Sequence, residues 1–232
     1  SNAMSEKILN ALMQLFAIIA RPDSSRSDRR TVVESFLNRQ LNHELVQEYL
    51  GVFDEYYTLH QEKQKESSKR VLRISSSSVR VLKICTAINE ELVQPQKIIV
   101  LIQLLEFVKS DSQEISDQEI QFINTVAETF NVPEEEYKEV KDFVLFSFDQ
   151  IPSSTEILLI DNNKDYSHNT TKQLYVDGLQ GQIRVLHVPS TKMYFIRYIG
   201  ENEIYLNGQL IQQDKVYVFT NGSSIRNPLI KP

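Results

Sequence analysis

The chain has 232 residues, 41% of them apolar and 24% charged, so it is globular material with room for one or two domains. Its only cysteine, Cys85, excludes a disulfide framework and fits a reducing cytoplasm. No stretch reaches about 18 apolar residues, which excludes a membrane-spanning helix. Ser1–Asn2–Ala3 ahead of Met4 is typical of an expression scar and is excluded from the fold.

The charge is distributed unevenly along the chain. Of the 25 Lys/Arg and 31 Asp/Glu residues, 8 and 7 lie after position 150, which leaves 17 basic and 24 acidic residues before it. An acidic N-terminal part argues against nucleic acid as a partner. Five of the six glycines also follow position 150. We therefore expect one domain over residues 4–150 and a second over 151–232, with the boundary near Ile151–Ser154.

Apolar residues at helical spacing predict helices throughout the first 150 residues. The stripes are Ile8, Leu12, Leu15, Phe16 and Ile19; Val32, Val33, Phe36 and Leu37; Leu45, Val46, Tyr49, Phe53 and Tyr56; and Val79, Leu82, Cys85 and Ile88. The intervening Gln61–Ser78 is rich in Lys, Glu and Ser. It is either a long exposed connection or the polar end of a helix that resumes at Val79.

Lys97–Phe107 is the most apolar segment of the chain, with seven aliphatic residues and a Phe among eleven positions. It is too short to span a membrane and too uniformly apolar for a surface helix. The sequence therefore predicts a buried central helix here. Another helix is expected from Asp117 to Phe130, and a last one opens at Pro133. Glu134, Glu135, Glu136 and Glu139 near its start could add metal ligands, but solvated side chains are the favoured interpretation.

Four carboxylates follow the central helix within nine residues, and they are the candidate metal ligands: Asp111, Glu114, Asp117 and Glu119. Calcium and similar hard cations prefer several oxygen ligands from one short turn. A simpler interpretation makes Ser116 the N-cap and Glu119 the third helical residue of a capping box, with Asp117 favoured by the helix dipole. The two interpretations are compatible. The spacing lacks the alternating ligands and the central Gly of an EF-hand.

A weak internal repeat relates two parts of the helical region. Ala17–Asp23 followed by Ser27–Arg30 matches Phe107–Asp111 followed by Ser116–Glu119. Each unit reads as a buried helix, a polar turn with an Asp, and a helix that begins at a Ser. We interpret this as a duplicated helical hairpin.

After residue 150 the apolar period changes to two, which predicts short strands. They cover residues 157–160, 183–188, 194–199, 204–206 and 216–219. Asn207–Gly208 and Asn221–Gly222 are strong hairpin-turn signals. The expected fold class is α+β: an all-α bundle followed by a small antiparallel β domain whose closing strand is not evident.

Residues 89–107, with Asp111, Ser116 and Glu119 behind them, resemble the TerB-like helical domains related to the tellurite-resistance protein TerB. The likeness covers roughly residues 8–148. It implies a helical bundle associated with metal ions, with a divalent cation such as calcium as the ligand. The first half departs from the family pattern, because Arg30 stands where the family has a Glu.

Residues 181–186, 206–211 and 221–228 resemble a forkhead-associated-type β domain. The Gly-Arg pair of the phosphothreonine-binding members is missing, and no Ser lies three residues before His187 or His168. Phosphopeptide recognition is therefore not carried over. A TerB-like domain followed by such a β domain resembles the N-terminal region of bacterial ABC transporter ATP-binding proteins, which implies an ATPase domain beyond Pro232.

The motif survey finds no phosphate loop, metal–cysteine cluster or nucleophile triad. We therefore predict a non-catalytic cytoplasmic regulatory or interaction region of an ABC transporter ATP-binding protein. It would act at the inner face of the membrane, with a protein or the rest of the transporter chain as partner, without nucleic acid and without inserting into the bilayer. The alternative is a free-standing tellurite-resistance-type stress protein that binds a divalent cation. A hydrolase with an acidic metal site is the least favoured hypothesis.

Overall fold

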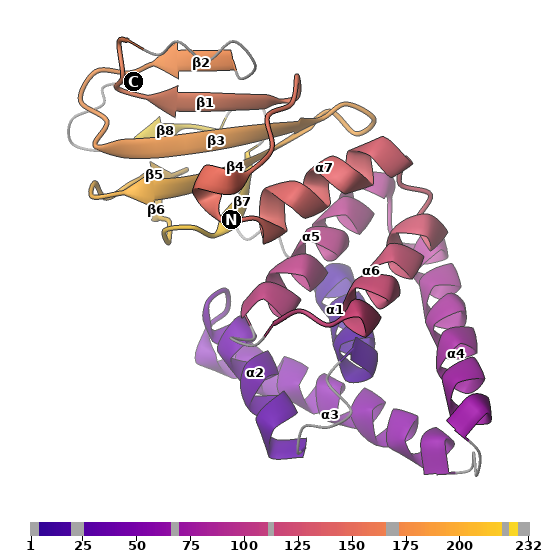
Figure 1. Ribbon diagram of the computed structural model, residues 1–232. Helices are drawn as coiled ribbons and strands as arrows, with labels where there is room; N and C mark the ends of the chain where they lie inside the picture. The colour runs from indigo at the N-terminus through magenta and orange to yellow at the C-terminus, as the bar shows by residue number, and fades with distance from the viewer. Residues whose placement is uncertain are drawn as a thin grey trace. The chain divides into compact units, whose positions relative to one another are not determined.

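The computed structural model describes residues 5–19, 26–65, 70–110, 114–165, 172–219 and 223–226, with the side chains of 26–28 and 61–78 left out. The chain divides into two compact units, Ser1–Pro133 and Glu134–Pro232. The predicted boundary lies near Ile151–Ser154, whereas this division falls before the last helix. The fold class is α+β, as predicted: helices come first and β-sheets follow (Figure 1).

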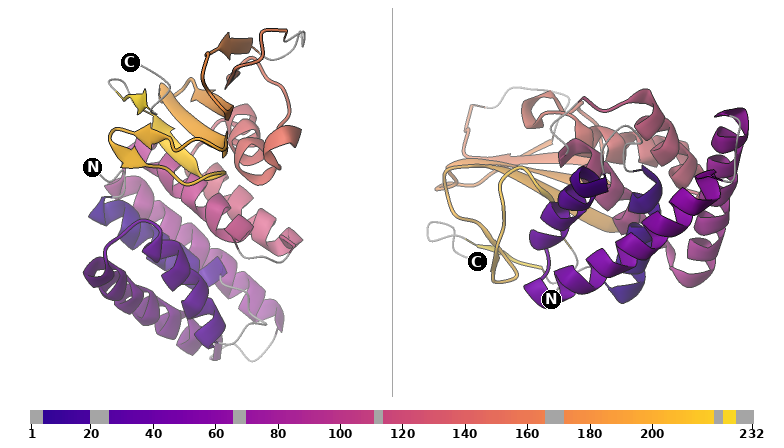
Figure 2. Two further views of the ribbon diagram at one scale, coloured as in Figure 1. Left: turned by 90° about the vertical axis from the view of Figure 1, so that its left-hand side faces the viewer. Right: turned by 90° about the horizontal axis from the view of Figure 1, so that it is seen from below.

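The described part of the first unit is helical (Figures 1 and 2). These helices are α1 (Glu6–Ile19), α2 (Arg26–Asn38), α3 (His43–Lys65), α4 (Arg70–Glu91), α5 (Gln94–Ser110) and α6 (Asp117–Thr129). The polar segment Gln61–Ser78 is helical at both of its ends, because α3 continues to Lys65 and α4 begins at Arg70. Of the two predicted alternatives, the polar helix end is correct for its described part.

The predicted central helix is confirmed, and a second helix is equally enclosed. In α5 every residue from Lys97 to Leu105 is buried. Most of α1 is buried as well, and α1 contacts α3, α4 and α5. The ring of Phe16 in α1 stacks on Phe107 in α5 at 4.1 Å, and Phe36 meets Phe16 edge-on at 5.1 Å. The core of this unit is therefore built on α1 and α5 together.

The two hairpins of the predicted repeat correspond to the helix pairs α1–α2 and α5–α6. In each pair the first helix supplies core residues. Asp23 and Asp111, on which the repeat was aligned, lie outside the described residues.

The second unit contains helix α7 (Glu134–Leu145), a 3-10 turn η1 (Phe148–Gln150) and two sheets. The larger sheet has the strand order β2-β1-β3-β4-β7, and the smaller one β6-β5-β8. The strands are β1 (Ile157–Asp161), β2 (Lys172–Tyr175), β3 (Gly181–Val188), β4 (Met193–Gly200), β5 (Tyr205–Leu206), β6 (Gln209–Leu210), β7 (Val216–Phe219) and β8 (Ile225–Arg226).

The predicted strands are all present, but the larger sheet is mixed, not purely antiparallel. Strands β1 and β2 run parallel, with Leu158 opposite Lys172. Every other pair is antiparallel. The strands β2, β6 and β8 were not predicted from the sequence.

The two faces of the larger sheet carry different side chains, because successive residues of a strand point to opposite sides. One face joins the smaller sheet in an apolar core that includes Ile183, Ile196 and Tyr198. The opposite face carries Arg184 and Arg197, which lie directly across from each other on β3 and β4. Helix α7 contacts β3 and is bonded to Arg197, so it belongs to this unit.

Candidate functional site

The predicted acidic turn joins α5 to α6. Helix α5 ends at Ser110, whose hydroxyl donates to the carbonyl of Phe107 at 2.8 Å. At the start of α6 both bonds of a capping box are present. The amide of Glu119 donates to Ser116 Oγ at 3.1 Å, and the amide of Ser116 donates to Glu119 Oε1 at 3.0 Å. The predicted capping box is confirmed.

The four predicted metal ligands have different surroundings. Glu114 and Asp117 are exposed, whereas Glu119 is only 7% exposed and has Oε1 in the capping box. Asp111 lies outside the described residues. Within the described ranges, no group of three or more His, Cys, Asp or Glu side chains is arranged to hold a metal ion. The three described carboxylates do not form such a group by themselves, and the metal site stays a prediction.

The first hairpin carries arginines at the corresponding place. Arg30 Nε lies 3.2 Å from a carboxylate oxygen of Asp54 on α3, and Arg30 Nη1 lies 3.8 Å from Glu34. The neighbouring Arg29 is buried and donates from Nη1 to the hydroxyl of Tyr57 at 2.6 Å. In the first hairpin the guanidinium of Arg30, paired with carboxylates, occupies the place that Glu119 has in the second hairpin. The two hairpins are therefore not equivalent sites.

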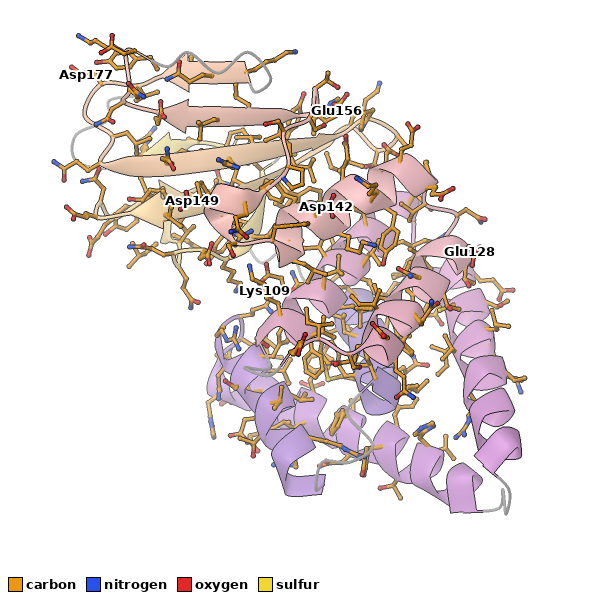
Figure 3. The ribbon with its side chains drawn as sticks, viewed as in Figure 1. Lys109, Glu128, Asp142, Asp149, Glu156 and Asp177 are labelled. Atoms are coloured by element: carbon orange, nitrogen blue, oxygen red, sulfur yellow. The ribbon has the colours of Figure 1, made fainter. Side chains whose placement is uncertain are left out.

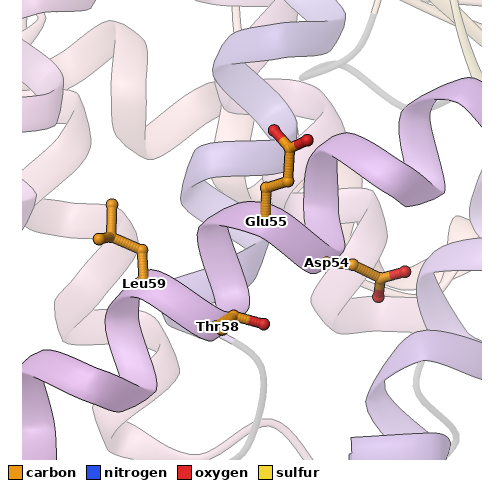
Figure 4. Close-up of a pocket in the computed structure, with 4 residues that line it drawn as sticks. All are labelled: Asp54, Glu55, Thr58 and Leu59. Atoms are coloured by element: carbon orange, nitrogen blue, oxygen red, sulfur yellow. The ribbon is translucent and has the colours of Figure 1, made fainter.

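A shallow, open hollow of about 420 Å³ lies along α3 (Figure 4). Its lining residues are Asp54, Glu55, Thr58 and Leu59. The carboxylate of Asp54 is already bonded to Arg30. The hollow has little apolar enclosure, so it does not have the form of a small-molecule site.

Two groups of the helical unit that could serve catalysis, Cys85 and His60, are buried. Cys85 is fully buried, and burial raises the pKa of its thiol to about 12, so the sulfur is protonated at neutral pH. Its burial agrees with its place in the predicted apolar stripe. In the buried His60, Nδ1 accepts from Arg80 Nη1 at 2.7 Å. Burial lowers the pKa of Arg80.

His187 lies on β3 in the second unit. Its Nδ1 is 2.8 Å from Glu156 Oε2, and its ring stacks on Tyr194 with 4.7 Å between centroids. Glu156 stands just before β1, where Figure 3 labels it. The His187 side chain is half-buried.

Arg197 is the most enclosed charged group of the second unit, with an exposed fraction of 0%. Its Nη1 donates to the carbonyls of Phe143 at 2.9 Å and Phe146 at 2.7 Å, at the C-terminal end of α7. Its Nε donates to Asp214 Oδ1 at 2.8 Å. A cation here compensates both the unpaired carbonyls and the negative end of the helix dipole. Its Nη2 is buried with no partner among the described residues.

A second arginine lies beside this one. Arg184 faces Arg197 across β3 and β4, and like charges in such a pair repel. The repulsion is offset by an aromatic ring, because both guanidinium groups lie over Phe148, at 4.9 Å and 5.9 Å from its centroid. Arg184 Nη1 also donates to the carbonyl of Ile151 at 3.3 Å. The pair therefore holds the segment that follows α7.

Two glutamates of α7 are not solvated as predicted. Glu139 Oε1 accepts from the hydroxyl of Ser154 at 2.6 Å, and Glu136 Oε1 accepts from the amide of Ser190 at 2.7 Å. Glu134 and Glu135 are exposed. The prediction is wrong for Glu136 and Glu139, because the side of the helix that carries them meets loops of the β-sheet, which the local sequence does not show.

The predicted hairpin at Asn207–Gly208 is confirmed between β5 and β6. Both residues have positive φ, 51° and 80°, as a type I′ turn requires. The Asn207 side chain also accepts from the amide of Ser224 at 2.9 Å and donates to Ser223 Oγ at 3.2 Å. In this chain the asparagine ties two loops together. Asn221–Gly222 lies outside the described residues.

The sequence pattern did not identify Arg197, Arg184 or Asp214 as site residues. A usable signal existed for Arg197. In Tyr194–Ile199 the residues alternate between the faces of a strand, and Arg197 shares its face with the buried Phe195. A charged residue at an inward position needs a partner. The sequence carries no signal that the partner is a helix end more than 50 positions earlier.

One protein family matches the chain: its description is Tellurite resistance protein TerB, and it covers residues 9–142. Comparison with curated proteins and with solved structures gave no significant match. In the described residues, no helix is long and apolar enough to cross a membrane.

Proposed function

This chain belongs to the TerB family, and from that premise we propose that it is a non-catalytic regulatory module whose helical unit binds a divalent cation at the turn between α5 and α6. The observation that carries the proposal is the capping box at Ser116 and Glu119. It fixes Glu119 at the start of α6, so Asp117 and Glu119 are held on a rigid helical support.

The ligands we propose are Asp111 together with Glu114, Asp117 and Glu119. Carboxylates that crowd one turn repel one another, and a divalent cation or a helix dipole offsets that repulsion. Calcium suits such a group because it takes six to eight oxygen ligands in a flexible geometry. Asp111 is the decisive residue, because the three described carboxylates do not form a metal-binding group by themselves.

The test is the melting temperature of the chain in chelator and in millimolar calcium or magnesium. A bound cation raises the melting temperature with concentration, because it binds the folded state only. Asp111→Asn should abolish the rise without touching the capping box. Glu119→Gln should weaken the rise, while Gln still serves the capping box. Glu128→Gln, at the exposed far end of α6, is the matched control and should behave as wild type.

If wild type shows no shift across millimolar calcium and magnesium, the turn is only a helix cap and the cation proposal is wrong. A shift that Asp111→Asn leaves unchanged would place the cation elsewhere in the molecule.

We further propose that the β unit docks on a protein or on the remainder of an ABC transporter ATP-binding chain, at the cytoplasmic face of the membrane. Support comes from the resemblance to a forkhead-associated-type domain, including the Asn207–Gly208 turn. The alternative is a free-standing stress protein, which the family's tellurite-resistance description favours. The reading frame beyond Pro232 discriminates between them. A following GxxxxGK[ST] motif supports the transporter, and a stop codon supports the free-standing protein.

A further inference from the structure

Strand β2 stands at one end of the larger sheet, so only one side of its backbone is paired within the sheet. The strand order β2-β1-β3-β4-β7 gives β2 a single neighbour, β1, and Figure 1 shows it as the outermost strand. The two strands run parallel, with Asp161 opposite Tyr175. Backbone groups on the open side of an edge strand are a template for another strand.

The hydrogen bonds between β1 and β2 show which residues of β2 point outward. The amide of Val176 donates to the carbonyl of Asp161 at 2.7 Å, and in a ladder the bonding residues of a strand alternate. Leu174 therefore points its backbone groups towards β1. The N–H and C=O groups of Gln173 and Tyr175 point the other way, and they have no partner among the described residues. The outer edge of β2 thus offers two donors and two acceptors.

The side chains of this edge alternate between the two faces of the sheet. On one face Leu174 is 50% exposed. On the other face Gln173 Nε2 donates to Asp161 Oδ1 at 2.6 Å, and the hydroxyl of Tyr175 donates to Asp177 Oδ1 at 3.2 Å. The polar side chains of the edge are therefore bonded within their own chain, whereas Leu174 presents apolar surface to solvent.

We propose that this edge binds the same edge of a second copy of the chain, with the two β2 strands antiparallel and a two-fold axis at Leu174. In this register Gln173 of each copy lies opposite Tyr175 of the other. These are the residues whose backbone groups point outward, so each opposite pair exchanges two hydrogen bonds and the interface contains four. The larger sheets of the two copies then continue into each other.

The same axis makes the exposed apolar residue of the edge meet itself, as a two-fold homodimer requires. The two Leu174 residues form the central non-hydrogen-bonded pair, in which Cα atoms are about 4.5 Å apart and side chains are close. Lys172 of one copy lies opposite Val176 of the other, so like charges do not face each other. If Gln173 lay opposite Leu174 instead, an outward-pointing residue would meet an inward-pointing one, and the bonds could not form.

The contact is short, so the dimer is weak. Stable interfaces bury about 800 Å² on each partner, and a few residues of one strand bury less than that. We therefore expect association at high protein concentration and dissociation on dilution. The interface consists of uncharged groups, so salt should change the association little. The inference does not depend on the proposed cation site.

Sedimentation equilibrium of the full chain over a concentration series tests the proposal. Wild type should move from the monomer mass towards twice that mass as the concentration rises. Tyr175→Pro should keep the chain monomeric, because proline lacks the outward N–H and an edge strand accepts it there, while the bonds of Leu174 to β1 remain. Tyr175→Phe is the matched control. It keeps the N–H and the ring, and it should associate as wild type does.

The position of the axis is tested at Leu174. Leu174→Glu places two carboxylates opposite each other and Leu174→Lys two ammonium groups, so each variant alone should stay monomeric. An equimolar mixture of the two variants should associate, because unlike charges then meet. Leu174 is half exposed, so neither charge is buried in the monomer.

Three results overturn the proposal. The first is a wild-type chain that stays monomeric at every concentration. The second is a mixture of the two Leu174 variants that does not associate. The third is a wild-type dimer that Tyr175→Pro leaves intact, which would place the contact on another surface. Because the mixture restores what each variant loses, it separates loss of the interface from loss of folding.

Discussion

Two helix ends in this chain are stabilised in opposite ways. The N-terminus of α6 is capped by Ser116 and Glu119, three positions apart and both within its own turn. The C-terminus of α7 is capped by Arg197, which lies 54 and 51 positions after the carbonyls that it binds. The first cap forms within one segment of chain. The second exists only after a strand and a helix have come together.

The surroundings of the two caps differ as much as their sequence separation. Ser116 is exposed, so water can replace part of its bonding. Arg197 is fully buried, and its partner Asp214 is half exposed. A buried polar group that loses its partner cannot form a hydrogen bond with water instead, so the free energy of unfolding falls more than at an exposed site. We therefore expect the cap at Arg197, which the local sequence does not indicate, to contribute more to stability than the cap at Ser116.

Arg197→Met should have the largest effect. It removes the hydrogen bonds that Arg197 donates to the carbonyls of Phe143 and Phe146 and to the carboxylate of Asp214. The buried carbonyl of Phe143 then loses this donor. We expect the free energy of unfolding to fall by about 3–5 kcal/mol in urea titrations followed by circular dichroism. Arg197→Lys should recover only part of this, because an ammonium group cannot reproduce the planar fork.

The control for this prediction is Arg226→Met on the exposed strand β8, which should stay within about 0.5 kcal/mol of wild type. If Arg197→Met also stays below about 1 kcal/mol, the buried cap is not the stronger of the two.

Ser116→Ala should have an intermediate effect. It removes the acceptor of the Glu119 amide, and the loss of an N-cap side chain lowers stability by about 0.5–2 kcal/mol. Glu119→Gln should be almost neutral in chelator, because the amide oxygen still accepts from the amide of Ser116. The same urea titrations measure both, with the exposed Gln118→Ala as control. If Ser116→Ala lowers the free energy of unfolding as much as Arg197→Met does, the two caps do not differ in their contribution to stability.

The smallest effect at neutral pH concerns two buried groups, one in each unit. Burial raises the pKa of Cys85 and of Tyr137 to about 12, from 9.0 and 10.0 respectively. In the unfolded chain each group loses its proton first, so the unfolded state binds fewer protons. The free energy of unfolding should therefore be unaffected below pH 9 and should fall as the pH rises from there towards 12.

Cys85→Ala should remove the part of this fall that begins near pH 9, and Tyr137→Phe the part that begins near pH 10. Urea titrations between pH 8 and pH 11 give the slope of the free energy of unfolding against pH for each variant. Each group contributes at most about 1.4 kcal/mol per pH unit to that slope. A wild-type slope that neither substitution alters would mean that both groups are hydrated.

The sequence alone determined the features that depend on neighbours along the chain. The apolar run Lys97–Phe107 could only be a buried helix, and α5 is buried from Lys97 to Leu105. Ser116 and Glu119 have capping-box spacing, and Asn207–Gly208 suits a turn with positive φ. Each of these depends on interactions within a few residues, which periodicity and turn chemistry describe.

Only the tertiary structure decided which distant residues meet. It brought Arg197 to the end of α7, Arg30 to Asp54, and β2 alongside β1. It also placed Glu136 and Glu139 against loops of the sheet, where the local pattern indicated solvent. A charged residue at an inward position of a strand pattern indicates that it needs a partner. The identity of that partner depends on packing between segments that are remote in the chain, and the neighbouring residues do not indicate it.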